Sequence, residues 1–233
     1  MEFDRIRYRH DEILNTFFKD KVVLDIASYD GSSSITLAEL GAKKVIGIEP
    51  RTESIELAKE NLKKSGYSNI EFVCGDATDY DLMDKLLTGV DSVACFGVFY
   101  HLTDHFKFLK KICSSSCQYL LIETLFGLES PNPTMVCAVE PTTGNDNQNG
   151  INEGYSHVMF GVPNIVWLQQ VFDIFNWQIA YFITDNLGDE RMIVGAVNKK
   201  FINVDASKVM PDDMWVWEIA DGETIGKKKF SIF

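Results

Sequence analysis

Residues 22–50 constrain the fold of this chain more than any other stretch, because they combine two apolar runs with a turn and a helical segment. The apolar run Val22–Leu24 is typical of a parallel strand that is covered on both faces. After Asp25 come a turn of small residues and three serines, any of which can cap a helix to about Leu40. A second strand ends at Glu49. In an open parallel sheet, a nucleoside-bearing ligand binds here and its ribose diol bonds to the acidic side chain.

The turn after Asp25 indicates which nucleoside the chain binds. A dinucleotide site needs G-x-G-x-x-G, because its backbone passes very close to a pyrophosphate. Here Tyr29 stands where the close-approach glycine is expected, and Asp30 adds a negative charge. A ligand with a cationic centre and no phosphate suits this turn better, and S-adenosylmethionine is such a ligand, since free backbone N–H groups can bind its carboxylate. The alternative is a strand-turn-helix unit that binds no ligand.

Composition and charge restrict the class of protein. The chain has 233 residues, of which 45% are hydrophobic and 24% charged, so we expect a single domain over residues 1–233 with a large core. Its formal net charge of −12 argues against a nucleic-acid backbone as the main partner, because such proteins usually carry a basic face.

The five cysteines form an odd set with no paired C-x-x-C, and no histidine cluster joins them. We therefore expect free, buried thiols and no metal site. The charged amino-terminal residues do not resemble a signal peptide, and no apolar run is long enough to span a bilayer. These features predict a cytoplasmic protein without a membrane segment.

Apolar segments with strand and helix character alternate over the first half of the chain. The charged and apolar pattern over residues 1–20 predicts an amphipathic amino-terminal helix that packs on the sheet. Three further strands are expected at Ile70–Val73, Asp91–Phe96 and Tyr119–Ile122, with helices between them. This alternation predicts an α/β fold with a largely parallel sheet.

The second half of the chain breaks this alternation. Residues 125–162 are rich in Pro, Asn, Gly and Thr, and we expect an insertion or lid loop there. Pro163 opens another helix, and residues 177–184 and 191–197 are expected to form an antiparallel hairpin at the edge of the sheet. Residues 200–233 form a carboxy-terminal extension that the sequence does not assign.

Acidic side chains end three successive strands of the predicted sheet. Asp25, Glu49 and Asp76 all fall at the edge where α/β proteins bind ligands. Asp76 is followed by Ala77, so a carboxylate and a backbone N–H lie together and can bind an adenine amine and ring nitrogen. For Asp79 and the nearby Asp81, a helix cap or a solvated turn is the favoured interpretation.

The pattern resembles the class I S-adenosylmethionine-dependent methyltransferases over residues 21–199. The family's first motif, D-x-G-x-G-x-G, is matched by DIASYDG, with Ala27 and Tyr29 in place of two glycines. The resemblance implies a Rossmann-like methyltransferase fold: a mostly parallel seven-stranded sheet, an antiparallel carboxy-terminal hairpin and helices on both faces. It implies S-adenosyl-L-methionine as cofactor and these cofactor-binding residues: Asp25, Ala27, Tyr29, Gly31, Glu49, Asp76, Ala77 and Phe96.

A narrower similarity connects the chain with the wobble-uridine tRNA-modifying branch of that family. It rests on the aromatic residue in the first motif, the segment G-V-F-Y-H-L at 97–102, Glu123-Thr124 and the prolines around the polar loop. The implied function is methyl transfer to an oxygen, nitrogen or carbon of an acceptor. The acidic chain has no evident RNA-binding extension, which favours a small-molecule acceptor. The alternatives are a tRNA-modifying enzyme and a cofactor-binding module without turnover.

Candidates for the acceptor side follow from the chemistry of methyl transfer. The reaction is an in-line displacement that depends on alignment, and a base is needed only if the acceptor loses a proton. Histidine titrates near neutral pH, and the remaining histidines, His10 and His105, are expected at the surface. The catalytic candidates are His101, Tyr100 and His157. The substrate-binding candidates are Glu123, Glu140 and Tyr155; for Glu140, a solvated loop residue is an equal alternative.

Overall fold

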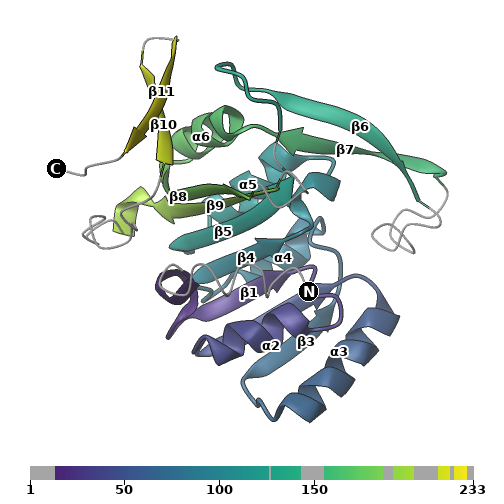
Figure 1. The fold of residues 1–233 in the computed structure, drawn as a ribbon. Helices are drawn as coiled ribbons and strands as arrows, with labels where there is room; N and C mark the ends of the chain where they lie inside the picture. Colours follow the sequence, from purple (N-terminus) through teal and green to yellow (C-terminus); the bar gives the residue numbers. More distant parts are fainter. Residues whose placement is uncertain are drawn as a thin grey trace.

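A computed structural model describes residues 14–125, 127–142, 155–185, 191–201, 215–220 and 223–229. Its centre is a seven-stranded sheet in the order β3-β2-β1-β4-β5-β9-β8 (Figure 1). The strands are β1 Val22–Ile26, β2 Lys44–Glu49, β3 Ile70–Cys74, β4 Ser92–Phe96, β5 Tyr119–Leu125, β8 Trp177–Asp185 and β9 Arg191–Asn198. Strands β1 to β5 are parallel, and β9 runs antiparallel to both β5 and β8. The predicted α/β class and the antiparallel edge are thereby confirmed.

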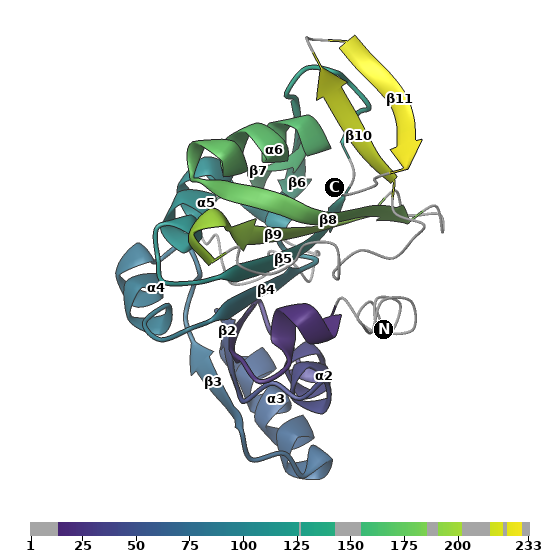
Figure 2. The same ribbon diagram turned by 90° about the vertical axis from the view of Figure 1, so that its left-hand side faces the viewer.

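Helices cover both faces of this sheet (Figure 2). One face carries the helical residues 14–18, α2 Ser32–Glu39 and α3 Thr52–Ser65; the other carries α4 Tyr80–Leu86, α5 His105–Cys113 and α6 Ile165–Ile174. Each face has its own apolar core, with Phe17 and Leu37 on the first and Phe108 and Phe172 on the second. Of the amino-terminal helix predicted over residues 1–20, the last turn is helical and buried; residues 1–13, including His10, lie outside the described residues.

The helix ends differ from the sequence prediction. The serines do not cap α2: its N-cap is Gly31, with a left-handed φ of 77° and no side-chain hydrogen bond. The hydroxyl groups of Ser33 and Ser34 donate to Asp25 instead. Asp79 does cap α4, in agreement with the favoured interpretation of its sequence position, because its carboxylate accepts the backbone N–H groups of Asp81 and Leu82.

The insertion predicted as a loop over residues 125–162 contains two strands. β6 Met135–Pro141 and β7 His157–Pro163 pair antiparallel and project from the sheet as a hairpin, at the upper right of Figure 1. The loop prediction is wrong for these strands because the polar residues between them dominate the composition, while the strands themselves are apolar and partly β-branched. The tip, residues 143–154, lies outside the described residues.

Asn164 fastens the two ends of this insertion to α6. Its Oδ1 accepts the backbone N–H groups of Thr134 and Trp167 at 3.0 and 2.9 Å. Its Nδ2 donates to the carbonyl oxygens of Ser130 and Asn132. Asn164 is 1% exposed, so this buried carboxamide caps α6 and holds the entry of the hairpin beside its exit.

The carboxy-terminal extension contributes β10 Trp215–Ala220 and β11 Glu223–Lys229, which pair with each other in a separate two-stranded sheet. No helix in the described ranges is long and apolar enough to cross a membrane. All five cysteines are free; Cys74 and Cys137 are exposed, so the expectation of burial is wrong for these two.

Candidate functional site

The turn after β1 has a backbone conformation typical of glycine, although Ala27 and Tyr29 stand at two of the glycine positions of the D-x-G-x-G-x-G motif. Ala27, Tyr29 and Gly31 have φ angles of 58°, 47° and 77°, all in the left-handed region. That region costs a non-glycine residue roughly 1–2 kcal/mol. A Cβ on Gly31 would lie 2.7 Å from the ring of Phe72 and 3.0 Å from Cβ of Ala58, so close packing also requires glycine there. The turn therefore has the backbone of the D-x-G-x-G-x-G motif.

Asp25 lies beneath this turn and is 1% exposed. Its Oδ2 accepts hydrogen bonds from the hydroxyl groups of Ser33 and Ser34, both at 2.6 Å. Burial raises the pKa of Asp25 to about 6; the two serine hydrogen bonds oppose this shift, and the nearby charge of Glu49 adds to it. The contacts of Asp25 thus fix the start of α2 against β1.

Glu49 ends β2 and is fully buried. Its Oε2 accepts the backbone N–H of Tyr29 at 3.3 Å, and its Oε1 accepts the backbone N–H and Nε of Arg51 at 3.1 and 2.5 Å. The guanidinium of Arg51 lies 5.2 Å from the ring centroid of Tyr29, which is 48% exposed. Glu49 therefore ties the strand end to the first-motif turn. The sequence pattern does not single out Arg51, although it stands only two residues beyond the predicted acid.

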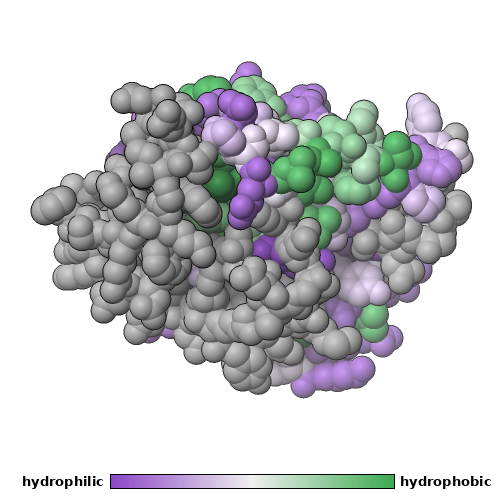
Figure 3. Space-filling view, turned by 45° about the horizontal axis from the view of Figure 1, so that its top comes forward, coloured by the Kyte–Doolittle hydropathy of each residue, from purple (hydrophilic) through white to green (hydrophobic). Residues whose placement is uncertain are grey.

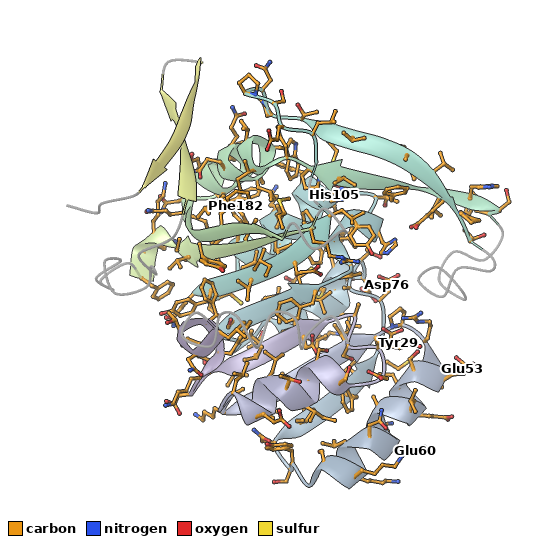
Figure 4. The ribbon with its side chains drawn as sticks, in the orientation of Figure 1. Tyr29, Glu53, Glu60, Asp76, His105 and Phe182 are labelled. Atoms are coloured by element: carbon orange, nitrogen blue, oxygen red, sulfur yellow. The ribbon has the colours of Figure 1, made fainter. Side chains whose placement is uncertain are left out.

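Asp76 lies at the next strand end. In the β2–β3 register Glu49 faces Cys74, and the N–H of Gly75 donates to the carbonyl oxygen of Glu49 at 3.0 Å. Asp76 Oδ1 accepts the N–H and hydroxyl groups of Thr78 at 2.7 and 2.8 Å. Figure 4 shows Tyr29 and Asp76 at the same edge of the sheet.

Ala77 and Phe96 contribute to the core beside this edge. Ala77 is 8% exposed and belongs to the apolar cluster on the α4–α5 face. The ring of Phe96 packs edge-on against Phe18 at 6.2 Å between centroids, on the opposite face. Their part in cofactor binding stays a prediction.

A second group of predicted residues meets after β4. The 3-10 turn η1, Phe99–His101, follows this strand. His101 Nδ1 lies 2.7 Å from Glu140 Oε1. The ring centroids of Tyr100 and His101 are 4.0 Å apart. Arg191 donates to Glu123 Oε1 at 2.8 Å, and its guanidinium lies 5.8 Å from the ring centroid of Tyr100. Four predicted residues thus form one series of contacts, in which Glu140 meets His101, His101 meets Tyr100, and Arg191 links Tyr100 to Glu123. Arg191 lies opposite Leu125, a position that could not be inferred before the strand pairing was known.

Glu140 is not a solvated loop residue. It is 9% exposed, although Val136 to Val139 and Pro141 in the same strand are all exposed. In Figure 3, which brings the top of the molecule forward, apolar side chains (green) gather on this exposed side. Two apolar side chains of the hairpin, those of Val139 and Met159, are 65% and 57% exposed. Glu140 is therefore a buried carboxylate in a strand whose apolar residues 136–139 are exposed.

The other predicted candidates do not join this group. His157 is exposed and contacts the neighbouring Ser156. Tyr155 is 72% exposed, and its carbonyl oxygen accepts the hydroxyl of Thr142. His105, expected at the surface, is 6% exposed, and its ring packs edge-on against Phe99. The surface prediction for His105 is therefore wrong. The same burial lowers the pKa of its imidazole.

Comparison with known proteins supplies the family. A family model described as a methyltransferase domain matches residues 17–174. The chain belongs to this methyltransferase family. The expected class I S-adenosylmethionine-dependent family is thereby confirmed.

Two curated relatives of the methyltransferase chain match shorter stretches. An uncharacterized protein of Methanocaldococcus jannaschii is 42% identical over 73 residues, which are 31% of this chain and 32% of that protein. The tRNA U34 carboxymethyltransferase of Campylobacter fetus is 31% identical over 113 residues, which are 46% of this chain and 38% of that protein. The chain therefore spans about a third of the length of these relatives.

Solved structures share the fold of this methyltransferase chain at low identity. The amino-terminal domain of EvdMO1 with S-adenosylhomocysteine gives a TM-score of 0.58 at 18% identity, covering 85% of this chain and 80% of that one. Magnesium protoporphyrin IX methyltransferase from Synechocystis with S-adenosylmethionine gives a TM-score of 0.57 at 16% identity. That match covers 84% of this chain and 77% of the other. The predicted Rossmann-like methyltransferase fold is thereby confirmed.

Proposed function

We propose that this methyltransferase chain transfers a methyl group from S-adenosylmethionine to a small-molecule acceptor. The observation that carries the proposal is the left-handed backbone at Ala27 and Tyr29, directly beside the buried carboxylate of Glu49. Strain at non-glycine residues persists only where the surrounding structure enforces it, and such residues cluster at ligand sites.

The residues at this edge fit the cofactor. Glu49 Oε2 accepts one long hydrogen bond, and a carboxylate oxygen has room for a second donor such as a ribose hydroxyl. Arg51 balances the charge of the buried carboxylate. Asp76, which follows the neighbouring strand, would accept the adenine amine. When bound, the cofactor supplies an electrophilic methyl group on a cationic sulfur.

The acceptor would lie toward the group formed after β4 and β5. Phe96, at the end of β4, faces Glu123 in the β4–β5 register, and β4 pairs on its other side with β1, which leads into the first-motif turn. Tyr100 and His101 follow β4 by a few residues. These polar side chains support a polar acceptor, held by hydrogen bonds in line with the methyl group.

Modification of tRNA is the second candidate. The similarity to the tRNA U34 carboxymethyltransferase of Campylobacter fetus favours it, whereas the net charge of −12 opposes it. A gel-shift titration with tRNA at low and moderate salt distinguishes a tRNA acceptor from a small-molecule acceptor. Salt-sensitive retention would support the tRNA acceptor, and no binding at low salt would leave the small-molecule acceptor.

Calorimetry with S-adenosylmethionine and S-adenosylhomocysteine tests the cofactor site. We expect Glu49→Gln and Asp76→Asn each to weaken binding about 10- to 100-fold, because each replaces a charged hydrogen-bond acceptor for the cofactor with a neutral one. Glu53→Gln, an exposed change on α3, is the matched control. Unchanged affinity in both site variants would contradict the proposal. Tight cofactor binding without transfer to any metabolite would instead favour a binding module.

A further inference from the structure

We infer that Glu140 and His101 form a dyad in which His101 Nε2 takes the proton of an acceptor hydroxyl during methyl transfer. The inference rests on the proposed function and deepens it, because it names the acceptor as an alcohol or phenol. It also changes the role expected for Glu140, which becomes a residue that positions His101 instead of one that binds substrate.

The hydrogen bond between the two side chains fixes the imidazole. A carboxylate can only accept, so at 2.7 Å His101 Nδ1 must be the donor and Glu140 Oε1 the acceptor. In a neutral imidazole with its proton on Nδ1, Nε2 carries the lone pair and is the basic atom. The ring of Tyr100, 4.0 Å away, restricts the orientation of the imidazole further.

Nε2 of His101 is itself buried and has no hydrogen-bond partner among the described residues. Buried polar atoms in folded proteins nearly always have a partner, so this nitrogen is available to a group outside the described residues. A hydroxyl group of a bound acceptor would supply that partner.

The placement of Glu140 argues against a merely structural contact. Strand β6 exposes its apolar side chains and buries its carboxylate, the reverse of what burial energies favour. An apolar residue at position 140 would anchor the hairpin at less cost. A buried carboxylate on the far nitrogen of a histidine is the arrangement that selects the tautomer and stabilises the imidazolium in serine hydrolases.

The chemistry selects the class of acceptor. Alkylation of a neutral hydroxyl oxygen requires loss of its proton, whereas a carboxylate needs no base. The step balances as follows: the O–H proton moves to His101 Nε2, the oxygen lone pair forms the O–CH₃ bond, and the electron pair of the broken S–C bond stays on sulfur. Glu140 stabilises the resulting imidazolium, which then releases its proton to water.

Nitrogen-15 NMR of the histidine rings tests the geometry without any cofactor. The chain has four histidines, so His101→Gln assigns the signal of His101. We expect the neutral His101 ring to carry its proton on Nδ1, and Glu140→Gln to shift the population toward the Nε2–H form. Glu129→Gln, an exposed change at the start of the insertion, is the control and should leave the signal unchanged. An Nε2–H tautomer in the wild-type chain would overturn the dyad.

Transfer assays test the role of the dyad. The probes are a set of simple phenols and alcohols and the corresponding carboxylic acids, each incubated with methyl-labelled S-adenosylmethionine. We expect methylation of hydroxyl probes, a roughly 10²–10⁴-fold lower kcat in His101→Gln, and a smaller loss of kcat at similar KM in Glu140→Gln, partly restored in Glu140→Asp.

The outcomes separate the dyad from the proposed function. Failure of the wild-type chain to bind cofactor would overturn the proposed function. Normal cofactor binding with transfer only to carboxylic acids would overturn the dyad alone. Transfer to neither set of probes would overturn the dyad, and only a further absence of transfer to any metabolite would also count against the proposed function. An unchanged kcat in His101→Gln would also overturn the dyad.

Discussion

The two ends of the candidate site are built in different ways. Most of the cofactor end comes from one continuous stretch, residues 25–51, to which Asp76 adds a carboxylate from the next strand end. It is held mainly by backbone conformation and by carboxylates that bind nearby N–H and hydroxyl groups. The acceptor end is assembled from η1, β5, β6 and β9, and its members meet through side-chain pairs. A backbone-defined turn tolerates changes of side chain, as Ala27 and Tyr29 illustrate. A set of side-chain pairs tolerates changes only when both partners change together.

The largest expected effect tests this dependence at the acceptor end. Arg191→Met leaves the carboxylate of Glu123, whose side chain is 5% exposed, without its paired cation. We expect a loss of about 3–5 kcal/mol in the free energy of unfolding, because an unpaired buried charge is costly. Urea denaturation of the wild-type chain and of Arg191→Met measures this loss of unfolding free energy.

The double variant Arg191→Met with Glu123→Met should regain most of that loss, since it removes both charges. Lys199→Met, which breaks the exposed pair with Asp173, is the control and should cost no more than about 1 kcal/mol. Equal losses of unfolding free energy in the single and double variants would show that the ion pair of Arg191 and Glu123 does not stabilise the acceptor end.

The next effect tests the buried acid at the cofactor end. The folded-state pKa of Asp25, about 6, lies above its ordinary value of 3.8, so the folded state holds this proton more tightly than the unfolded state. The stabilisation from this proton is present at low pH and is lost as the pH rises through about 6. Over about pH 4 to 7 the wild-type chain should lose roughly 3 kcal/mol that Asp25→Asn does not lose.

Denaturation at a series of pH values gives the difference between Asp25→Asn and the wild-type chain. Asp81→Asn, at an exposed position in α4, is the control for removing one carboxylate. A difference for Asp25→Asn that is independent of pH would mean that the desolvation of Asp25 is not what limits its ionisation.

The smallest effect concerns the backbone of the turn. Ala27→Gly should raise the free energy of unfolding by about 1 kcal/mol, because glycine adopts the left-handed conformation without strain. Gly31→Ala should lower it by about 1–3 kcal/mol, since φ is +77° and the new Cβ meets Phe72. Thermal unfolding of both variants provides the measurement. A loss of stability in both would mean that side-chain packing, and not backbone conformation, defines the turn.

The sequence alone predicts the strands and helices around the candidate cofactor end well, because the signals for these elements are local. The strand that ends at Glu49, the helix that follows the turn and the antiparallel edge formed by residues 177–184 and 191–197 all agree with the structure. Hydrophobic runs and strand-end acids carry this information within a short window. The exact caps do not follow in the same way: Ser33 and Ser34 are equally good caps by type, and only the position of Asp25 directs them elsewhere.

The acceptor end is less predictable because it depends on pairings between distant residues. Glu140 lies 39 positions from His101, and Arg191 lies 68 positions from Glu123. His105 is expected at the surface, yet tertiary packing against Phe99 buries it. His157 lies near Glu140 in the hairpin but on the exposed side, and the side of a strand cannot be assigned until its register is known.

The carboxamide of Asn164 has a consequence for how this family member could change. One buried side chain closes the base of the hairpin and starts α6, so the strands beyond that closure can vary without altering the central sheet. Recombining the hairpin between relatives, with Asn164 retained, would exchange the partner of His101 while leaving the nucleoside half intact. New acceptor preferences could thus arise by swapping a single module.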